Sequence, residues 1–168
     1  MRREFQILAI VALMSLLLTA CAQSASESPA GSIAPAGSSA PAGSTAPSGT
    51  TVNVTLVEWG VVVDDSSVPA GEVTFAVTND GPDDVHEFVV MKTDLDPAAL
   101  PTDATGKVDE AGGDMEVIDE IEDMAVGDAQ ELTVTLEAGS YVLLCNIYSA
   151  DEGEAHYTMG MWTAFTVE

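Results

Sequence analysis

The residues with the most distinctive chemistry in this chain are Cys145, His156, Met161 and His86. The first three fall within one stretch, LLCNIYSADEGEAHYTMGMW, and His86 lies in a separate strand-like run, DVHEFVVM. A thiolate, two imidazoles and a thioether form a soft ligand set that suits copper. A trigonal site of two His and one Cys with a weak axial Met is an electron-transfer site. These residue types therefore predict a copper centre.

The scarcity of these residues supports the prediction. The chain contains only two histidines and two cysteines in 168 residues, and Cys21 has a separate explanation, given below. Cys145 therefore lacks a disulfide partner, and a solitary thiol in an exported protein needs a reason. The alternative is a buried free cysteine that acts as a small hydrophobic residue in the apolar run YVLLC. The joint placement of all four residues favours metal binding.

This arrangement resembles the blue copper proteins, the cupredoxins, which include plastocyanin, azurin and sulfocyanin. Their pattern has an upstream His on one strand and then, after a long interval, a Cys, a His and a Met clustered at the end of the domain. The resemblance covers residues 52–168. It implies a Greek-key β-sandwich in which His86, Cys145, His156 and Met161 bind one type 1 copper ion.

The sequence departs from the family pattern between the cysteine and the second histidine. Family members usually place two to four residues there, whereas ten residues separate Cys145 from His156. We expect the extra residues, YSADEGEA, to form a polar loop that bulges into solvent, because loop closure entropy grows only slowly with length. Met159 is a second thioether candidate, but Met161 keeps the family's spacing to the histidine.

The resemblance also suggests where electrons enter and leave. In the family, the edge of the second histidine reaches a surface patch used for electron exchange. Around His156 the sequence offers Tyr157, Met159 and Trp162 as an apolar group beside the ligand. These residues are the expected docking contact.

Residues 1–20 have the form of a secretory signal. Arg2 and Arg3 precede the apolar residues 7–18, and the sequence LTAC follows. The apolar stretch is too short to span a bilayer comfortably. The segment is similar to bacterial lipoprotein signals, in which the cysteine becomes the lipidated first residue of the mature chain. Cys21 is therefore the predicted membrane anchor, on the extracytoplasmic face; an ordinary signal peptide with an incidental Cys is the alternative.

Residues 21–50 have the composition of a tether. Prolines recur every six residues in the unit PAGSxA, and the segment carries almost no charge. Because it has too few large apolar side chains to offset the entropy of ordering, we expect it to be disordered. A flexible coil of this length has a mean span on the order of 30 Å.

Residues 51–168 suit one domain with one core. Short β-branched runs separated by Gly, Pro, Asn and Asp predict an all-β fold, an antiparallel sandwich. Residues 93–129 are less regular, and MEVIDEIEDM within them suits either a strand or a short helix. Asn79 and Asn146 are candidates for hydrogen bonds that brace the ligand loops, although packing or turn roles are equally open. The expected strands are 51–59, 72–79, 85–91, 131–136, 140–145 and 161–167.

The charge of the chain excludes one class of partner. Of the four basic and 28 acidic residues, two lysines and 27 acidic residues lie beyond the predicted signal. Such acidity argues strongly against a nucleic-acid partner. It can steer a basic redox protein, but a solubility device or an adaptation to high salt would have the same composition.

No hydrolytic constellation is visible beside the metal-binding residues, and a Cys–His protease needs a third orienting group and a pocket. The sequence therefore predicts a non-enzymatic, monomeric copper protein, held at the membrane by lipid, that passes single electrons between extracytoplasmic redox proteins. Two alternatives remain open. One is a protein that stores or delivers copper with the same ligands, and the other is a metal-free sandwich used for binding.

Overall fold

The computed structural model describes residues 49–168, so the predicted signal, Cys21 and nearly all of the predicted tether lie outside the described residues. The first strand begins at Thr50, one residue before the predicted start of the domain. Within the described part of the chain, no helix is long and apolar enough to cross a membrane.

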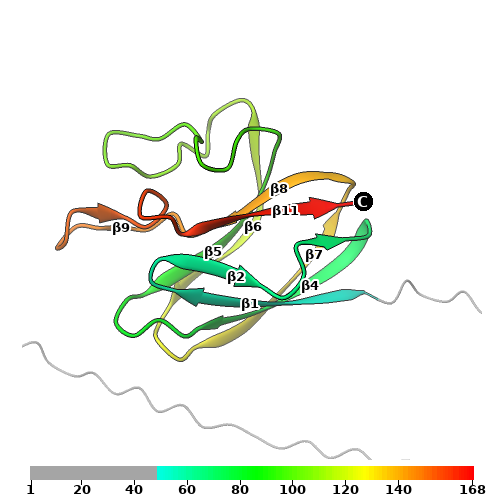
Figure 1. Cartoon of the computed structure of the whole chain (residues 1–168), viewed down its shortest axis with the longest axis horizontal. Coiled ribbons are helices and arrows are strands. Elements are labelled where there is room, and N and C mark those ends of the chain that lie inside the picture. Colours follow the sequence, from blue (N-terminus) through cyan, green and yellow to red (C-terminus); the bar gives the residue numbers. More distant parts are fainter. Residues whose placement is uncertain (1–48) are drawn as a thin grey trace, which may run out of the picture. The chain divides into compact units, whose positions relative to one another are not determined.

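The described residues form a β-sandwich of two main sheets, which confirms the predicted fold class (Figure 1). One sheet has the strand order β2-β1-β4-β7 and the other has the order β3-β11-β8-β5-β6. Most pairs are antiparallel, but β1 pairs with β4, and β3 with β11, in parallel. The strands are β1 (Thr50–Val57), β2 (Gly60–Val63), β3 (Ser67–Val68), β4 (Gly71–Asn79), β5 (His86–Thr93), β6 (Met115–Met124), β7 (Ala129–Leu136), β8 (Gly139–Leu144), β9 (Tyr148–Ser149), β10 (Glu154–Ala155) and β11 (Trp162–Val167).

The main core lies between the two sheets and follows from alternation along the strands. Every second residue of β4 points inward, ending with the buried Asn79. Phe75 of β4 meets two aromatic rings of the opposite sheet, Phe88 and Phe165, at centroid distances of 5.2 and 5.5 Å. Each fully buried side chain of this size contributes roughly 1.5–3 kcal/mol to the free energy of unfolding. The core thus fixes how the two sheets face each other.

Strands β5 and β8 are buried on both faces, which explains their continuous apolar runs. Their outer face packs in a second apolar cluster against Leu100 and Val108, which belong to the irregular connection between β5 and β6. That connection holds a single isolated bridge, between Thr102 and Val108. The segment predicted to be irregular therefore serves as a cover for the ligand-bearing sheet.

The structure settles the ambiguous run MEVIDEIEDM as strand β6. Ile121 and Met124 point into the core, while most of its acidic side chains are exposed. Its pairing with β5 shifts register between His86 and Phe88, an irregularity of the kind that re-aims a side chain. The very short strands β2 and β3 and the β9–β10 hairpin were not predicted.

Candidate metal centre

Two of the predicted ligands are placed by paired strands. His86 is the first residue of β5, and Cys145 directly follows the last residue of β8. These strands are antiparallel neighbours, and Val89 is registered opposite Leu144. The pairing therefore brings the start of β5 and the end of β8 to the same end of the sheet.

The side chains of His86, Cys145 and His156 converge, each offering one donor atom, and these atoms lie within 4.8 Å of one another. The two Nδ1 atoms are 3.2 Å apart, and Cys145 Sγ lies 3.4 Å from His156 Nδ1. All three residues are at most 1% exposed. Two imidazole nitrogens and one sulfur facing one point are the trigonal donor set of a type 1 copper site, so the residues present fit one copper ion.

The β9–β10 hairpin accounts for the long interval between Cys145 and His156. The amide of His156 donates to the carbonyl of Ile147 at 2.9 Å, which closes the base of the hairpin. If residues 148–155 are set aside, two residues separate Cys145 from His156, within the spacing of the resembled family. The insertion projects from the sandwich at the end opposite the C-terminus, as a hairpin rather than as an irregular loop (Figure 1).

Met161 and Met159 occupy different environments. Met161 is fully buried and belongs to the same core cluster as Cys145. Its carbonyl accepts a hydrogen bond from the Cys145 amide at 3.0 Å, and its amide donates to the His156 carbonyl at 3.1 Å. Met159 is 42% exposed. Burial beside the donor cluster favours Met161 as the thioether ligand.

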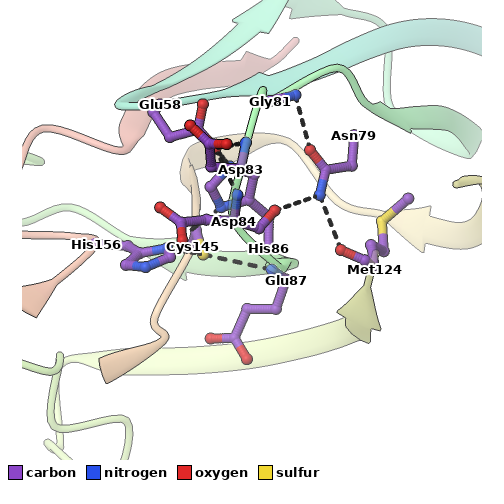
Figure 2. A network of polar contacts seen from close by, with 10 residues as sticks. All are labelled: Glu58, Asn79, Gly81, Asp83, Asp84, His86, Glu87, Met124, Cys145 and His156. Carbon is purple, nitrogen blue, oxygen red and sulfur yellow. Dashed lines mark hydrogen bonds and ion pairs between the residues drawn. The ribbon is translucent and has the colours of Figure 1, made fainter. Parts of the chain in front are cut away.

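Asn79 braces the β4–β5 loop that leads to His86, as the sequence suggested. Its side-chain amide donates to the carbonyls of Asp84 and Met124 at 2.9 and 2.8 Å, and its oxygen accepts from the Gly81 amide at 2.9 Å (Figure 2). Gly81 is required by close packing, because a Cβ there would lie 3.0 Å from His86 Nε2 and 2.6 Å from a Glu58 oxygen.

Glu58, whose role was not predicted from the sequence, lies next to His86. One carboxylate oxygen accepts the amides of Asp84 and Asp83 at 2.9 and 3.2 Å and lies 3.6 Å from His86 Nε2. The signal that could have found it is the sequence EWG, a charged residue and an aromatic at the turn that ends β1. Among the described residues, three buried polar side-chain atoms have no hydrogen-bond partner: Glu58 Oε2, His86 Nε2 and His156 Nε2. All three belong to this end of the domain.

Glu87 and Asn146 join the cysteine to its surroundings. The Glu87 amide donates to Cys145 Sγ at 3.3 Å, and a Glu87 carboxylate oxygen accepts from the Asn146 amide at 2.7 Å. The Asn146 side chain bonds both the amide and the carbonyl of Val108, at 2.6 and 3.1 Å. Asn146 therefore braces the ligand loop against the covering segment, as the sequence suggested.

Burial keeps the donor atoms uncharged at neutral pH. It raises the pKa of the Cys145 thiol to about 12. Burial and the neighbouring His156 lower the pKa of His86 to about 4, and burial also lowers the pKa of His156. Because a metal binds the thiolate, metal uptake must release the thiol proton, while the imidazoles are already in the form that binds.

The expected exposed histidine edge is not found. His156 is 1% exposed, and Tyr157 is buried with its hydroxyl donating to Pro97 and accepting from Leu100. Trp162 packs against the second apolar cluster. Of the three residues expected to form the docking contact, Tyr157 is buried, Trp162 is partly exposed and Met159 is exposed.

The comparisons place this fold among known structures. No protein-family model and no curated protein matches the chain. The solved structures that resemble it include auracyanin from Roseiflexus castenholzii, with 24% identity, 71% of this chain and 97% of that chain covered, and a TM-score of 0.50. Auracyanin A from Chloroflexus aurantiacus has 21% identity, coverage of 71% and 99%, and a TM-score of 0.49. Rusticyanin from Thiobacillus ferrooxidans has 18% identity, coverage of 73% and 79%, and a TM-score of 0.48. The described domain has the cupredoxin fold.

Proposed function

We propose that this protein is a type 1 copper electron carrier in which His86, Cys145 and His156 would hold one copper ion, with Met161 as the thioether ligand. The observation that carries the proposal is the convergence of two Nδ1 atoms and one Sγ in a buried cluster. A bound copper ion would supply a reversible one-electron redox change. With its donor atoms buried, the site suits exchange of an electron rather than turnover of a bound substrate.

The residues around the cluster suit electron transfer because they hold its donors in place. His86 and Cys145 are held by paired strands, and sites on strands are more precise than sites on loops. The side chains of Asn79, Glu87 and Asn146 fix the adjoining backbone through hydrogen bonds. Donors that move little between two oxidation states impose a small reorganisation barrier.

Burial argues against storage or delivery of copper. A protein that hands over its metal needs donor atoms that an acceptor can reach, whereas all three donor residues here are at most 1% exposed. Retention of the metal during redox cycling is the expected behaviour. Incubation of the loaded protein with a copper chelator distinguishes these functions, because a delivery protein would lose its copper quickly.

Titration of the metal-free protein with Cu(II), followed by visible absorption, tests the proposal. We expect an intense thiolate-to-copper band that saturates at one ion per chain. Cys145→Ser should abolish the band, since the thiolate is its source, while Met159→Leu should leave it largely intact. A strongly coloured Cys145→Ser protein would show that the assignment is wrong.

The cellular setting is part of the same proposal and is supported by the sequence alone. LTAC and the preceding apolar stretch support a lipid anchor at Cys21 on the extracytoplasmic face of the membrane. The partners would then be extracytoplasmic redox proteins. Cys21→Ser should move the protein from the membrane fraction to the soluble fraction without altering its copper spectrum, and retention at the membrane would contradict the anchor.

A further inference from the structure

The His156 ring is enclosed by protein, although an electron carrier needs a route from its metal site to the surface. The residue is 1% exposed, and its Nε2 atom is buried without a hydrogen-bond partner. A partner protein therefore cannot touch this imidazole directly. If electrons pass through this end of the domain, a different side chain must lie between His156 and the partner.

Trp59 is in the position to do this. It belongs to the turn between β1 and β2, and its ring packs edge-to-face against the His156 ring, with centroids 5.0 Å apart. Trp59 is partly exposed, so it contacts both the buried imidazole and solvent. Gly160 packs near the backbone of Trp59, because a Cβ at Gly160 would lie 3.7 Å from the Trp59 carbonyl oxygen. The preceding residue, the exposed Met159, therefore also lies near Trp59.

Exposed carboxylates lie on the segments that meet at this contact. Asp83 is exposed on the β4–β5 loop, and its amide donates to Glu58, the residue before Trp59. Glu152 is exposed on the β9–β10 hairpin that leads to His156. A surface with a central aromatic residue and an acidic rim complements a partner with an apolar centre and a basic rim. Charge thus indicates the chemistry of the partner.

We propose that Trp59 is the docking contact, next to His156, for a basic one-electron redox protein. This inference rests on the proposed electron-transfer function. The partner's cofactor and the centre bounded by His86, Cys145 and His156 exchange one electron. No bond forms or breaks, and no proton or group moves. Trp59 provides the apolar centre of the contact, and the carboxylates steer the partner toward it.

Binding is measured first, because it does not depend on turnover. Calorimetric titration with a basic c-type cytochrome should give a dissociation constant at least ~10-fold higher for Trp59→Ala than for the unchanged protein, as expected for a central aromatic anchor. Val62→Ala is the matched control, since Val62 is an apolar residue of β2 that is 56% exposed. Its dissociation constant should stay within about twofold, as for most surface contacts.

Electron-transfer kinetics then distinguish the loss of a docking contact from damage to the metal centre. Stopped-flow reduction of copper-loaded Trp59→Ala by the cytochrome should slow at least ~10-fold, whereas reduction of the same protein by a small cationic metal complex should not slow, because that complex needs no docking surface. Trp59→Phe, which keeps an aromatic ring, should recover part of the rate. Should Trp59→Ala fail to fold, Trp59→Phe and the pair Glu152→Gln with Glu154→Gln still test the proposal. The charge variants should weaken the salt dependence of the cytochrome reaction, since screening acts on surface charge.

The outcomes distinguish the two proposals. If the unchanged protein is reduced by both reagents and Trp59→Ala behaves like Val62→Ala in binding and kinetics, the role of Trp59 is wrong and the carrier function stands. If neither reagent reduces the unchanged protein, both proposals are wrong. Slower reduction of Trp59→Ala by both reagents, with unchanged binding, would make Trp59 a structural support of the centre and would overturn its docking role.

Discussion

His86 and His156 bring the same atom, Nδ1, to the same place by different means. His86 is registered on a paired strand, and its loop is held by the side chain of Asn79 and by close packing at Gly81. His156 lies on a connection closed by backbone hydrogen bonds, one to Ile147 and one from Met161. The position of His86 therefore depends on the identities of its neighbours, while the position of His156 depends on the closure of a loop.

Asn79→Ala should have the largest effect on the hydrogen-bond network that supports His86. The change would leave two buried backbone groups and one partly buried group without their partner, so the free energy of unfolding of the metal-free protein should fall by about 2–4 kcal/mol. Urea denaturation followed by fluorescence measures the loss. Asn53→Ala is the matched control, because Asn53 is exposed and bonds Asp64 at the surface. Equal losses for the two variants would mean that the network around His86 is not a special support.

Glu87 follows His86 on β5, and its amide donates to Cys145 Sγ. Ionisation of its side chain gives a prediction about how stability depends on pH. Burial raises the pKa of Glu87 from 4.5 to about 7, against the lowering effect of the Asn146 amide. Between these pH values the folded protein binds a proton that the unfolded chain has lost, so this contribution to stability is present below pH 4.5 and disappears as the pH rises through 7. Glu87→Gln removes the effect.

The stability of Glu87→Gln relative to the unchanged, metal-free protein should therefore increase between pH 5 and pH 8, by about 1–3 kcal/mol. Urea unfolding at the two pH values measures this difference. Glu131→Gln, at an exposed position of β7, serves as the control and should show no such trend. A relative stability of Glu87→Gln that stays constant with pH would contradict the burial argument.

The connection that carries His156 should tolerate a much larger change in sequence. Replacing residues 148–155 with two glycines removes the hairpin but keeps the closure between Ile147 and His156. Because loop length affects closure entropy only weakly, the free energy of unfolding should change by less than about 1 kcal/mol. Thermal unfolding and the copper spectrum measure the result. Loss of the copper band in a folded variant would mean that the hairpin itself positions the ligand.

Much of the sandwich could be predicted because its strands alternate or form continuous apolar runs. The six expected strands correspond to β1, β4, β5, β7, β8 and β11, with ends that differ by at most a few residues. Strand β6 could not be separated from a helix because acidic residues interrupt its pattern on the exposed face. Strands β2 and β3 have four and two residues, too few for a periodic signal.

The site was predictable in its residue types and in two of its supports, Asn79 and Asn146, and not in the rest of its surroundings. His86, Cys145 and His156 were chosen for their chemistry, and the structure brings them together. The sequence EWG could have drawn attention to Glu58 and Trp59, but their roles and that of Glu87 depend on how distant segments meet. The enclosure of His156 was missed for the same reason, since its neighbour Trp59 lies almost a hundred residues earlier in the chain.

The closure at the base of the β9–β10 hairpin has an evolutionary consequence. Two backbone hydrogen bonds, from His156 to Ile147 and from Met161 to His156, hold the ligand, and neither involves the tip of the hairpin. Mutation can therefore lengthen, shorten or recharge the tip, where Glu152 is exposed, without disturbing the donor atoms. Partner recognition by the hairpin can therefore evolve without a change in the redox chemistry of the metal site.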